Sequence, residues 1–525
     1  MTRFKQVPKR KNFLIFLVFV AFSFGLLYIC TASSPRYATN PWDDANAFFT
    51  VGRAMASGAT IYKDIFEQKG PLLYLIHALA SFISDSSFVG VYVFQSVFLG
   101  INAFAAYKIA SLYVNTGWSI TSAVLTCFVT VNSNCYYYGD SAEEFCLPLL
   151  MISLYVFCAY FKDTEHNRIS KPVFLLIGFF AGCVAMIKFT VIGFWFAWAA
   201  YISLHTLFAK KDFKNAVLNA LVFLGGMAAA TVPWIVYFSL KGALSEFINA
   251  YFILNATVYP RNDGLNLVGY AVVLIKSIAE NIITSPAVFV CGFLGVAMYL
   301  FTNIFAEKKA FSRLSIPLVC AVGTYIVYSG LRCYFYYFLP ISVFSVFTFI
   351  TVAYVAEKFI KLNAKQAVSI AISVFVAAGC LAGSVFCNGT SRNALKKDEK
   401  TVQYKAAQYI KSHNVNGRIL NYNRLDFGVY LAAGQVPSFK YFERQNFDYE
   451  KYPDNIDEQN SYIDSGKADY VVVVLKSTDS VDEIYKENIN LKDKYRIVYS
   501  EQFSTSRSVN MDDRYIQTLY LFERK

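Results

Sequence analysis

Repeated apolar runs constrain the fold of this chain more than any other feature of its sequence. Mostly apolar stretches of about 20 residues follow one another up to residue 387, and a helix of that length can cross the hydrocarbon core of a bilayer. The chain is 56% hydrophobic, with a mean hydropathy of +0.39. The sequence therefore predicts an α-helical polytopic membrane protein with about eleven transmembrane helices. We place them at residues 13–32, 88–114, 118–138, 144–162, 172–187, 189–208, 215–239, 281–304, 314–332, 335–356 and 367–387.

Lysine and arginine gather in alternate loops, and this pattern predicts the orientation of the spans. Cytoplasmic loops carry such an excess, so we expect a cytoplasmic N-terminus and an extracytoplasmic segment after residue 387. The net charge of +12 belongs almost wholly to residues 1–387. Topology accounts for this charge, and nothing in the sequence favours a nucleic-acid partner. The basic regions are residues 3–11, 162–171, 210–214, 308–313 and 358–365.

The chain changes character after residue 387. The tail is more polar, and it combines an amphipathic helical stretch with strand-like runs of β-branched and aromatic residues. We therefore expect a transmembrane domain at 1–387 and a small extracytoplasmic α/β domain at 388–525. The helical stretch lies near 397–412, and the strand-like runs lie at 418–422, 470–475 and 515–522.

The first predicted outer loop, residues 33–87, contains two short helical patterns. Residues 43–57 have apolar side chains at helical spacing and stop before Gly58, and a second helix is expected to begin at Pro71. Both runs are too short to cross a bilayer. We expect interfacial helices that rest on the membrane.

Asp43 and Asp44 begin the first of these helices. One interpretation is structural, because acids at a helix N-terminus cap it and complement its dipole. The other is catalytic, because a carboxylate in a partly dry cleft can take a proton from an acceptor hydroxyl as its oxygen attacks a sugar carbon. The two roles are compatible.

Three cations from distant segments fall on the same predicted outer side. They are Lys69, Lys188 and Arg332. Each can be an interfacial anchor, and each can instead bind a phosphate at headgroup depth. Glu67 lies two residues before Lys69 and is a candidate for binding the acceptor or a metal ion.

Glu143 and Glu144 follow a predicted outer turn. Ser141 and Glu144 have the spacing of a capping box, which is a structural explanation. The alternative is that the two carboxylates bind acceptor hydroxyls or a divalent metal ion, the only cofactor that the sequence suggests.

These motifs resemble those of bacterial type C glycosyltransferases (GT-C fold) related to protein O-mannosyltransferases and lipid A aminoarabinose transferases. The resemblance rests on the acidic first loop, the pattern Gly-x-x-x-Tyr-x-Asp-x-Phe-Glu-x-Lys-Gly-Pro that ends at Pro71, and the later Glu-Glu pair, and it covers about residues 10–360. The family's first-loop catalytic aspartate is matched better by Asp44 than by Asp43. Lys69-Gly70-Pro71 stands where the family has Lys-Pro-Pro.

The resemblance implies an inverting transferase that takes a sugar from a polyprenyl-phosphate carrier in the cell membrane. Its acceptor would be a cell-wall polymer, a glycolipid or a protein. Asp44 would be the base, Lys69 with Lys188 or Arg332 would hold the lipid phosphate, and the glutamates would orient the acceptor. The alternatives are a transporter or flippase of lipid-linked glycans and a non-catalytic scaffold. Neither a paired repeat nor ionisable residues at the bilayer midplane, which would favour transport, stands out in the sequence.

Overall fold

The computed structural model describes residues 9–162, 168–260, 264–306, 310–332, 334–359, 365–393, 401–476, 478–504 and 516–525. Parts of the predicted basic head, of three basic loops and of the amphipathic stretch lie outside these ranges, at 1–8, 163–167, 308–309, 360–364 and 397–400. The chain forms two compact units, each assembled from separate segments. The first unit contains residues 1–30, 95–236 and 261–388, and the second contains residues 31–94, 237–260 and 389–525.

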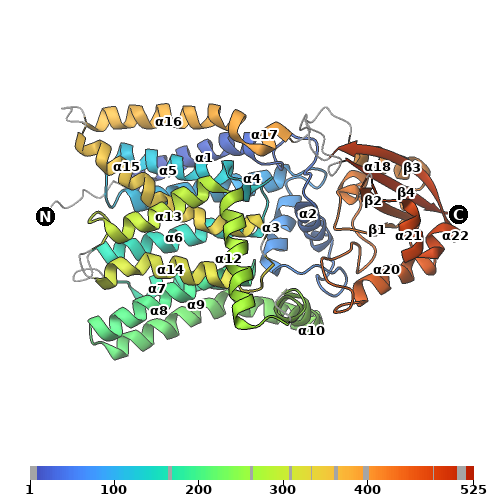
Figure 1. Ribbon diagram of the computed structural model, residues 1–525, viewed down its shortest axis with the longest axis horizontal. Helices are drawn as coiled ribbons and strands as arrows, with labels where there is room; N and C mark the ends of the chain where they lie inside the picture. The colour runs from blue at the N-terminus through green and yellow to red at the C-terminus, as the bar shows by residue number, and fades with distance from the viewer. Residues whose placement is uncertain are drawn as a thin grey trace. The chain divides into compact units, whose positions relative to one another are not determined.

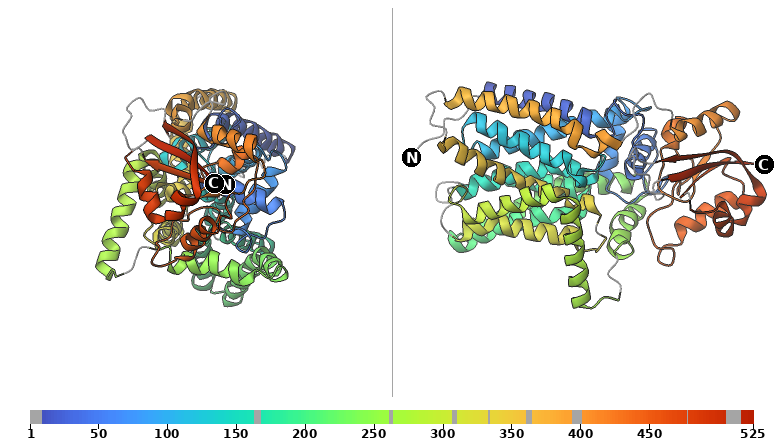
Figure 2. Two further views of the ribbon diagram at one scale, coloured as in Figure 1. Left: turned by 90° about the vertical axis from the view of Figure 1, so that its right-hand side faces the viewer. Right: turned by 45° about the horizontal axis from the view of Figure 1, so that its top comes forward.

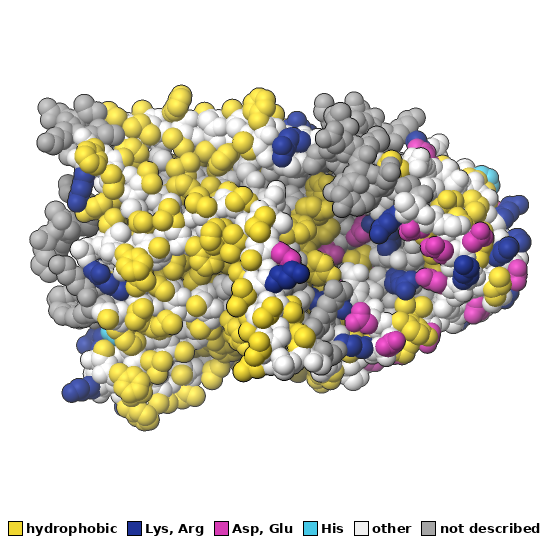
Figure 3. All heavy atoms as spheres, in the orientation of Figure 1, with side chains coloured by type: hydrophobic (Ala, Val, Ile, Leu, Met, Phe, Trp, Pro, Cys, Tyr) yellow, Lys and Arg dark blue, Asp and Glu magenta, His cyan; other side chains and the backbone are white. Residues whose placement is uncertain are grey.

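The first unit is a bundle of helices, with α1 and α16 side by side along one edge (Figures 1 and 2). Hydrophobic side chains cover most of the face of this bundle that Figure 3 shows, as expected of a surface in contact with lipid. Two of the helices, α4 and α9, continue into the second unit. The helices are α1 (Lys9–Cys30), α4 (Val89–Ala110), α5 (Thr116–Asn132), α6 (Ala142–Lys162), α7 (Lys171–Ala185), α8 (Gly193–Leu204), α9 (Phe213–Leu240), α12 (Leu267–Thr284), α13 (Pro286–Phe301), α14 (Ala310–Tyr328), α15 (Ser345–Phe359) and α16 (Lys365–Cys387), with short turns η1 (Asn134–Tyr136), η2 (Phe189–Ile192), η3 (His205–Ala209) and η5 (Phe335–Phe344).

Nine helical segments of the described chain are long and apolar enough to cross a membrane. The prediction of a multi-pass helical membrane protein is confirmed, although the helices differ from the eleven expected. Two predicted spans, α7 and α13, are only 15 and 16 residues long. The α12 helix was not predicted, and a break at Ser285 and Pro286 separates it from α13 within the expected span 281–304.

The α12 helix runs across the other helices of the bundle (Figures 1 and 2). Its N-terminus is capped by the Asn266 side chain, which accepts a hydrogen bond from the Gly269 backbone amide. Apolar side chains such as Val268 and Ile275 are exposed along it, and its Tyr270 hydroxyl donates to the Ser329 carbonyl at 2.9 Å. An amphipathic helix with this crossing direction is typical of one that lies along a membrane surface.

The second unit contains a four-stranded mixed sheet in the order β1-β2-β4-β3. The first pair is parallel and the other two pairs are antiparallel. The prediction of a small α/β domain in the tail is confirmed, but β3 was not predicted. The strands are β1 (Ile419–Asn421), β2 (Tyr470–Lys476), β3 (Tyr495–Ser504) and β4 (Ile516–Arg524), and the tail helices are α17 (Gly389–Asn393), α18 (Val402–His413), α19 (Val429–Ala433), α20 (Asp454–Asp464), α21 (Val481–Glu487) and α22 (Ile489–Lys494).

The first-loop helices α2 (Asp43–Ala56) and α3 (Pro71–Ser81) also belong to the second unit, together with the short turns α10 (Leu244–Phe247), η4 (Ile248–Ile253) and α11 (Leu254–Thr257). Both predicted helices are confirmed, with proline at the start of α3. The expectation that α2 rests on the membrane is wrong, because every residue from Ala45 to Ala54 is buried. The backbones of α2 and α3 touch at Gly52, where an added Cβ would lie 2.4 Å from the His77 Cβ.

Candidate active site

Both first-loop aspartates lie in the first turn of α2. Trp42 precedes the helix with an extended backbone, and its side chain does not cap the helix. The Asn46 amide instead donates to the carbonyls of Asn40 and Trp42, at 2.9 and 3.0 Å, and fixes the chain that enters α2. The two carboxylates are therefore placed where the dipole of a buried helix favours negative charge.

Asp43 is held by an arginine from the tail. The Arg424 Nε donates to Asp43 Oδ2 at 3.1 Å, and a terminal guanidinium nitrogen donates to the same oxygen. The other terminal nitrogen of Arg424 donates to Gln517 Oε1 of β4 at 3.1 Å. The second Asp43 oxygen, Oδ1, is buried and has no hydrogen-bond partner among the described residues. The tail thus neutralises one side of this carboxylate and leaves the other side without a donor.

A second contact between α2 and the tail follows two turns further along the helix. The Thr50 hydroxyl donates to Asp426 Oδ2 at 2.6 Å, and the Gly428 amide donates to Asp426 Oδ1 at 2.8 Å. The Asp426 backbone amide donates to Glu443 Oε2 at 2.6 Å. Gly428 has φ +88° and lies against the Asn46 side chain, which leaves little room for another residue at this position.

Glu67 and Lys69 form a local pair before α3. The Lys69 amide donates to Glu67 Oε2 at 2.9 Å, and the Lys69 ammonium lies 3.9 Å from Glu67 Oε1. The Tyr62 hydroxyl donates to the Lys69 carbonyl at 2.6 Å. The ammonium lies over the Phe48 ring of α2, 5.7 Å from its centroid. Lys69 therefore has a fixed backbone and a partly exposed charged end beside the aspartate helix.

Burial dominates the electrostatics of the acids in the second unit. It raises the pKa of Asp43, against the effect of Arg424, and it raises the pKa of Glu67, against the effect of Lys69. It also raises the pKa of Asp426 to about 6 and that of Glu443 well above its usual value. The charge of a neighbouring acid also raises the pKa of each of these carboxylates. We call Asp43, Asp44, Glu67, Asp426 and Glu443 the second-unit acidic cluster.

In the first unit, Glu143 and Lys188 form a buried ion pair. Lys188 follows α7, and Glu143 lies in the first turn of α6. The Lys188 ammonium also lies 3.3 Å from the centroid of the Tyr337 ring, in η5. Lys188, expected as a phosphate ligand, therefore contacts a carboxylate that was expected to bind the acceptor.

Glu144 is surrounded by donors. Its Oε1 accepts a hydrogen bond from the Tyr136 hydroxyl at 2.8 Å, and its Oε2 accepts from the Gln95 amide at 2.9 Å and the Asp140 backbone amide at 2.7 Å. The Glu144 amide donates to Ser141 Oγ at 3.1 Å, as the predicted capping box requires. The return bond goes to Asp140, one residue earlier than in the usual box.

Arg332 is buried in the turn between α14 and η5. It precedes the η5 tyrosines that flank Lys188. The predicted residues thus fall into two groups. Asp43, Asp44, Glu67 and Lys69 belong to the second unit, whereas Glu143, Glu144, Lys188 and Arg332 belong to the first unit.

Solved structures with a similar fold come from glycosyltransferases. The arabinofuranosyltransferase AftD from Mycobacteria has a TM-score of 0.53 and 14% identity, over 99% of this chain and 40% of AftD. ArnT from Cupriavidus metallidurans in the apo state has a TM-score of 0.51 and 12% identity, over 98% of each chain. This chain has the GT-C fold. No family model and no curated protein matches the sequence.

The candidate residues of this GT-C fold do not fit a divalent ion well. Glu143 already pairs with Lys188, and both oxygens of Glu144 accept hydrogen bonds from protein groups. Among the described residues, no group of three His, Cys, Asp or Glu side chains is arranged to hold a metal ion. Glu143 and Glu144 are therefore not proposed as metal ligands.

Sequence reasoning missed the contribution of the tail. Arg424, Asp426 and Glu443 lie on the segments that follow β1, and no motif marked them. One signal was present: Arg424 and Asp426 come directly after a buried strand, and the carboxyl ends of parallel strands often carry functional side chains. The partner of Arg424, Asp43, is 381 residues away in the sequence, and the Thr50 partner of Asp426 is 376 residues away.

Proposed function

We propose that this protein is a membrane glycosyltransferase that moves a sugar from a polyprenyl-phosphate carrier to an extracytoplasmic acceptor. The observation that carries the proposal is the pairing of a carboxylate helix with a partly exposed lysine in the second unit, through α2 and Lys69. A base and a phosphate-binding cation are the two groups that such a transfer requires. The GT-C fold supports the same reaction class.

Asp44 is the proposed base. Asp43 lies beside it with one oxygen bound by Arg424, so Asp43 is the better suited of the two to a fixed supporting position. Asp44 removes the proton of the acceptor hydroxyl as its oxygen forms a bond to the anomeric carbon. The bond from that carbon to the phosphate oxygen breaks, and its electron pair leaves with the lipid phosphate. A single displacement of this kind inverts the anomeric centre.

The leaving phosphate gains charge in the transition state. A cation fixed in advance stabilises that charge without reorganising, which makes electrostatic stabilisation effective. Lys69 meets this requirement, because Tyr62 and Glu67 fix its backbone while its ammonium remains partly exposed. Lys188 and Arg332 are proposed as further phosphate ligands. In that role Lys188 would keep Glu143 as its counterion.

An assay of sugar transfer separates this function from that of a flippase. Purified protein in proteoliposomes, whose two leaflets can be distinguished, is incubated with radiolabelled polyprenyl-phosphate sugars and with membranes as the acceptor source. We expect the label to leave the lipid and to enter an acceptor, and we expect Asp44→Asn to block this transfer. The proposal fails if no sugar of the panel leaves its lipid, or if labelled lipid only moves between leaflets.

The proposed site requires the second unit to face outward. A cysteine introduced at Ser461, on α20 of the tail, should react with an impermeant thiol reagent in intact cells. A cysteine introduced at Lys211, in a predicted cytoplasmic loop, is the matched control and should react only after lysis. Protection of the Ser461 site in intact cells would contradict the predicted orientation and the proposed function with it.

A further inference from the structure

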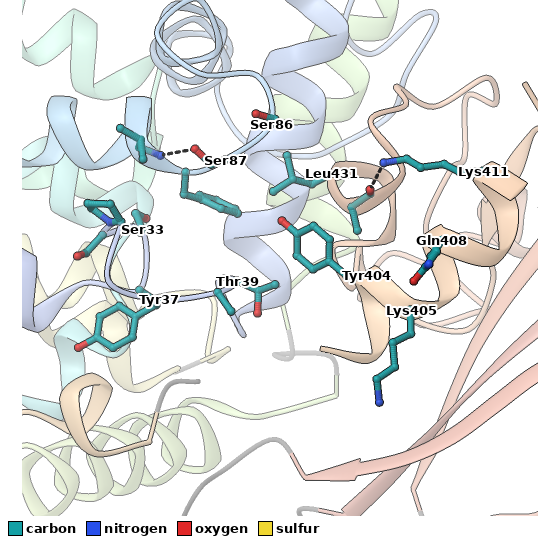
Figure 4. A pocket seen from close by; sticks show the side chains of 17 residues that line it. Ser33, Tyr37, Thr39, Ser86, Ser87, Tyr404, Lys405, Gln408, Lys411 and Leu431 are labelled. Carbon is teal, nitrogen blue, oxygen red and sulfur yellow. Dashed lines mark hydrogen bonds between the residues drawn. The ribbon is translucent and has the colours of Figure 1, made fainter. Parts of the chain in front are cut away.

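The second unit contains a cavity of about 750 Å³ that none of the proposed catalytic residues lines. Its walls come from the loop 32–39, from residues 86–89, and from α18 and α19 of the tail (Figure 4). The volume lies within the range of small-molecule sites in proteins. The cavity is therefore large enough to bind a ligand apart from the reacting groups.

The α18 helix presents one stripe of side chains to this cavity. Tyr404, Gln408 and Lys411 line it at spacings of four and three residues, which place them on one face of a helix (Figure 4). Tyr404 is 39% exposed, and Gln408 is also exposed. The opposite stripe of α18, which includes Ala406 and Ile410, is buried. The amphipathic pattern of this segment thus has a packing face and a face toward the cavity.

The lining combines aromatic rings with hydroxyl and amide groups. Ser33, Thr39 and Ser86 supply hydroxyls, Tyr37 and Tyr404 supply rings, and Gln408 supplies an amide. A sugar ring has an apolar face of C–H bonds and a rim of hydroxyls that both donate and accept hydrogen bonds. Aromatic rings suit the first feature, and hydroxyl and amide groups suit the second.

The charges of the cavity are already compensated in part. The Lys405 ammonium lies 2.5 Å from Glu501 Oε1, and the Lys411 ammonium donates to the Ala432 carbonyl at 2.8 Å (Figure 4). The Ser33 hydroxyl is buried, and it finds no hydrogen-bond partner in the part of the chain that the structure describes. These features favour a ligand that is rich in hydroxyls over a bare anion.

We propose that this cavity binds a saccharide of the acceptor, at a distance along the glycan from the sugar that receives the new bond. This inference rests on the proposed transferase function and identifies the acceptor as a glycan. The donor sugar must lie next to its phosphate and thus near Lys69, whereas an acceptor chain has further sugars that need a site of their own. No residue of the second-unit acidic cluster lines the cavity, as such a separate site requires.

Binding to a glycan array tests this site without any turnover. The full-length protein in nanodiscs is labelled and applied to an array of neutral, amino and phosphate-bearing oligosaccharides. We expect binding to a defined set of saccharides and a loss of about tenfold or more in affinity for Tyr404→Ala and for Gln408→Leu. Tyr449→Ala is the matched control, because Tyr449 is another exposed tail tyrosine, 51% exposed, that does not line the cavity.

Two further arms separate the possible results. Asp44→Asn should bind the array as the unmodified protein does, because the catalytic step is not involved. A polyprenyl-phosphate sugar should not compete with the bound saccharide, and competition would assign the cavity to the donor and overturn the proposal. Absence of array binding, or an equal loss of affinity in Tyr404→Ala and Tyr449→Ala, would also overturn the proposal. The transferase function would still hold in that case if Asp44→Asn blocks sugar transfer.

Discussion

In the second unit, Asp426 and Glu443 are buried and Asp43 is partly buried, each near another acid, and Asp43 has an oxygen without a donor among the described residues. In the first unit, Glu143 has a lysine partner and Glu144 accepts three hydrogen bonds. Mutual repulsion of buried carboxylates costs stability, and such arrangements often mark functional sites. We propose that the second-unit acidic cluster is arranged for chemistry, whereas Glu143 and Glu144 chiefly fix the bundle.

Removal of the proposed base should have the largest effect. A general base contributes about 10²–10⁴-fold to a rate, so Asp44→Asn should lower transfer by that factor while the donor still binds. Asp43→Asn should have a smaller effect, because it retains an oxygen that can accept from Arg424. Asp64→Asn in the same loop is the control, since the exposed Asp64 carboxylate accepts from the Thr60 amide and has no role in the proposed reaction. A greater loss in Asp43→Asn than in Asp44→Asn would move the base to Asp43.

The ion pair of the first unit should show its role in stability. Loss of one partner of a buried pair costs about 3–5 kcal/mol, so Lys188→Met and Glu143→Gln should each lower the unfolding temperature strongly. The double variant should recover much of that loss, because no charge remains buried alone. Donor affinity of the double variant decides whether Lys188 also binds phosphate. Recovered stability with unchanged donor affinity would leave Lys188 with a structural role alone.

The pH dependence of stability should reveal the raised pKa of Asp426 in the second unit. Folding raises the pKa of Asp426 from 3.8 to about 6, so the folded state holds this proton more tightly than the unfolded state. Asp426 therefore contributes most stability below pH 4, and roughly 3 kcal/mol of it is lost as the pH rises to 6. Asp426→Asn should reduce this slope in thermal unfolding measured from pH 4 to 7. Asp493→Asn, at an exposed site on α22, should leave the slope unchanged.

The smallest predicted effect concerns the lipid phosphate. Lys69→Met keeps the apolar stem of the side chain and removes its charge, and it should weaken binding of a polyprenyl-phosphate sugar by about 1.5–3 kcal/mol. Lys63→Met is the control, because Lys63 is an exposed lysine of the same loop. Unfolding temperatures should stay close to that of the unmodified protein in both variants. Equal donor affinity in the two would contradict the phosphate role of Lys69.

Strong local signals explain which parts of the fold could be predicted. Valine-rich β2 and the helices of the first loop follow patterns that need no distant contact. The β3 strand was missed because apolar and polar residues do not alternate cleanly along it. Its pairing with β4 holds it in the sheet. The α12 helix was missed because Lys276 and Glu280 interrupt its apolar run.

Only the residues of the candidate site that lie close together in the sequence could be predicted. Asp43, Asp44 and Lys69 stand close together in the sequence and match a local pattern. Arg424 and Asp426 are candidates because they contact Asp43 and Thr50 of α2, which are 381 and 376 residues away in the sequence. No rule on sequence spacing covers such a separation, and only the folded second unit brings these residues into contact.

The discontinuous second unit sets an order of events during biosynthesis. Asp43 leaves the ribosome 381 residues before Arg424, and at synthesis rates of 5–20 residues per second the delay is roughly 20–75 s. During that interval the helices of the bundle can insert. The α2 helix still lacks Arg424, which binds Asp43, and Asp426, which accepts from Thr50. The sheet also waits for β4, which is made after β3 and lies between β2 and β3. The second unit of a nascent chain is therefore incomplete until β4 has been made.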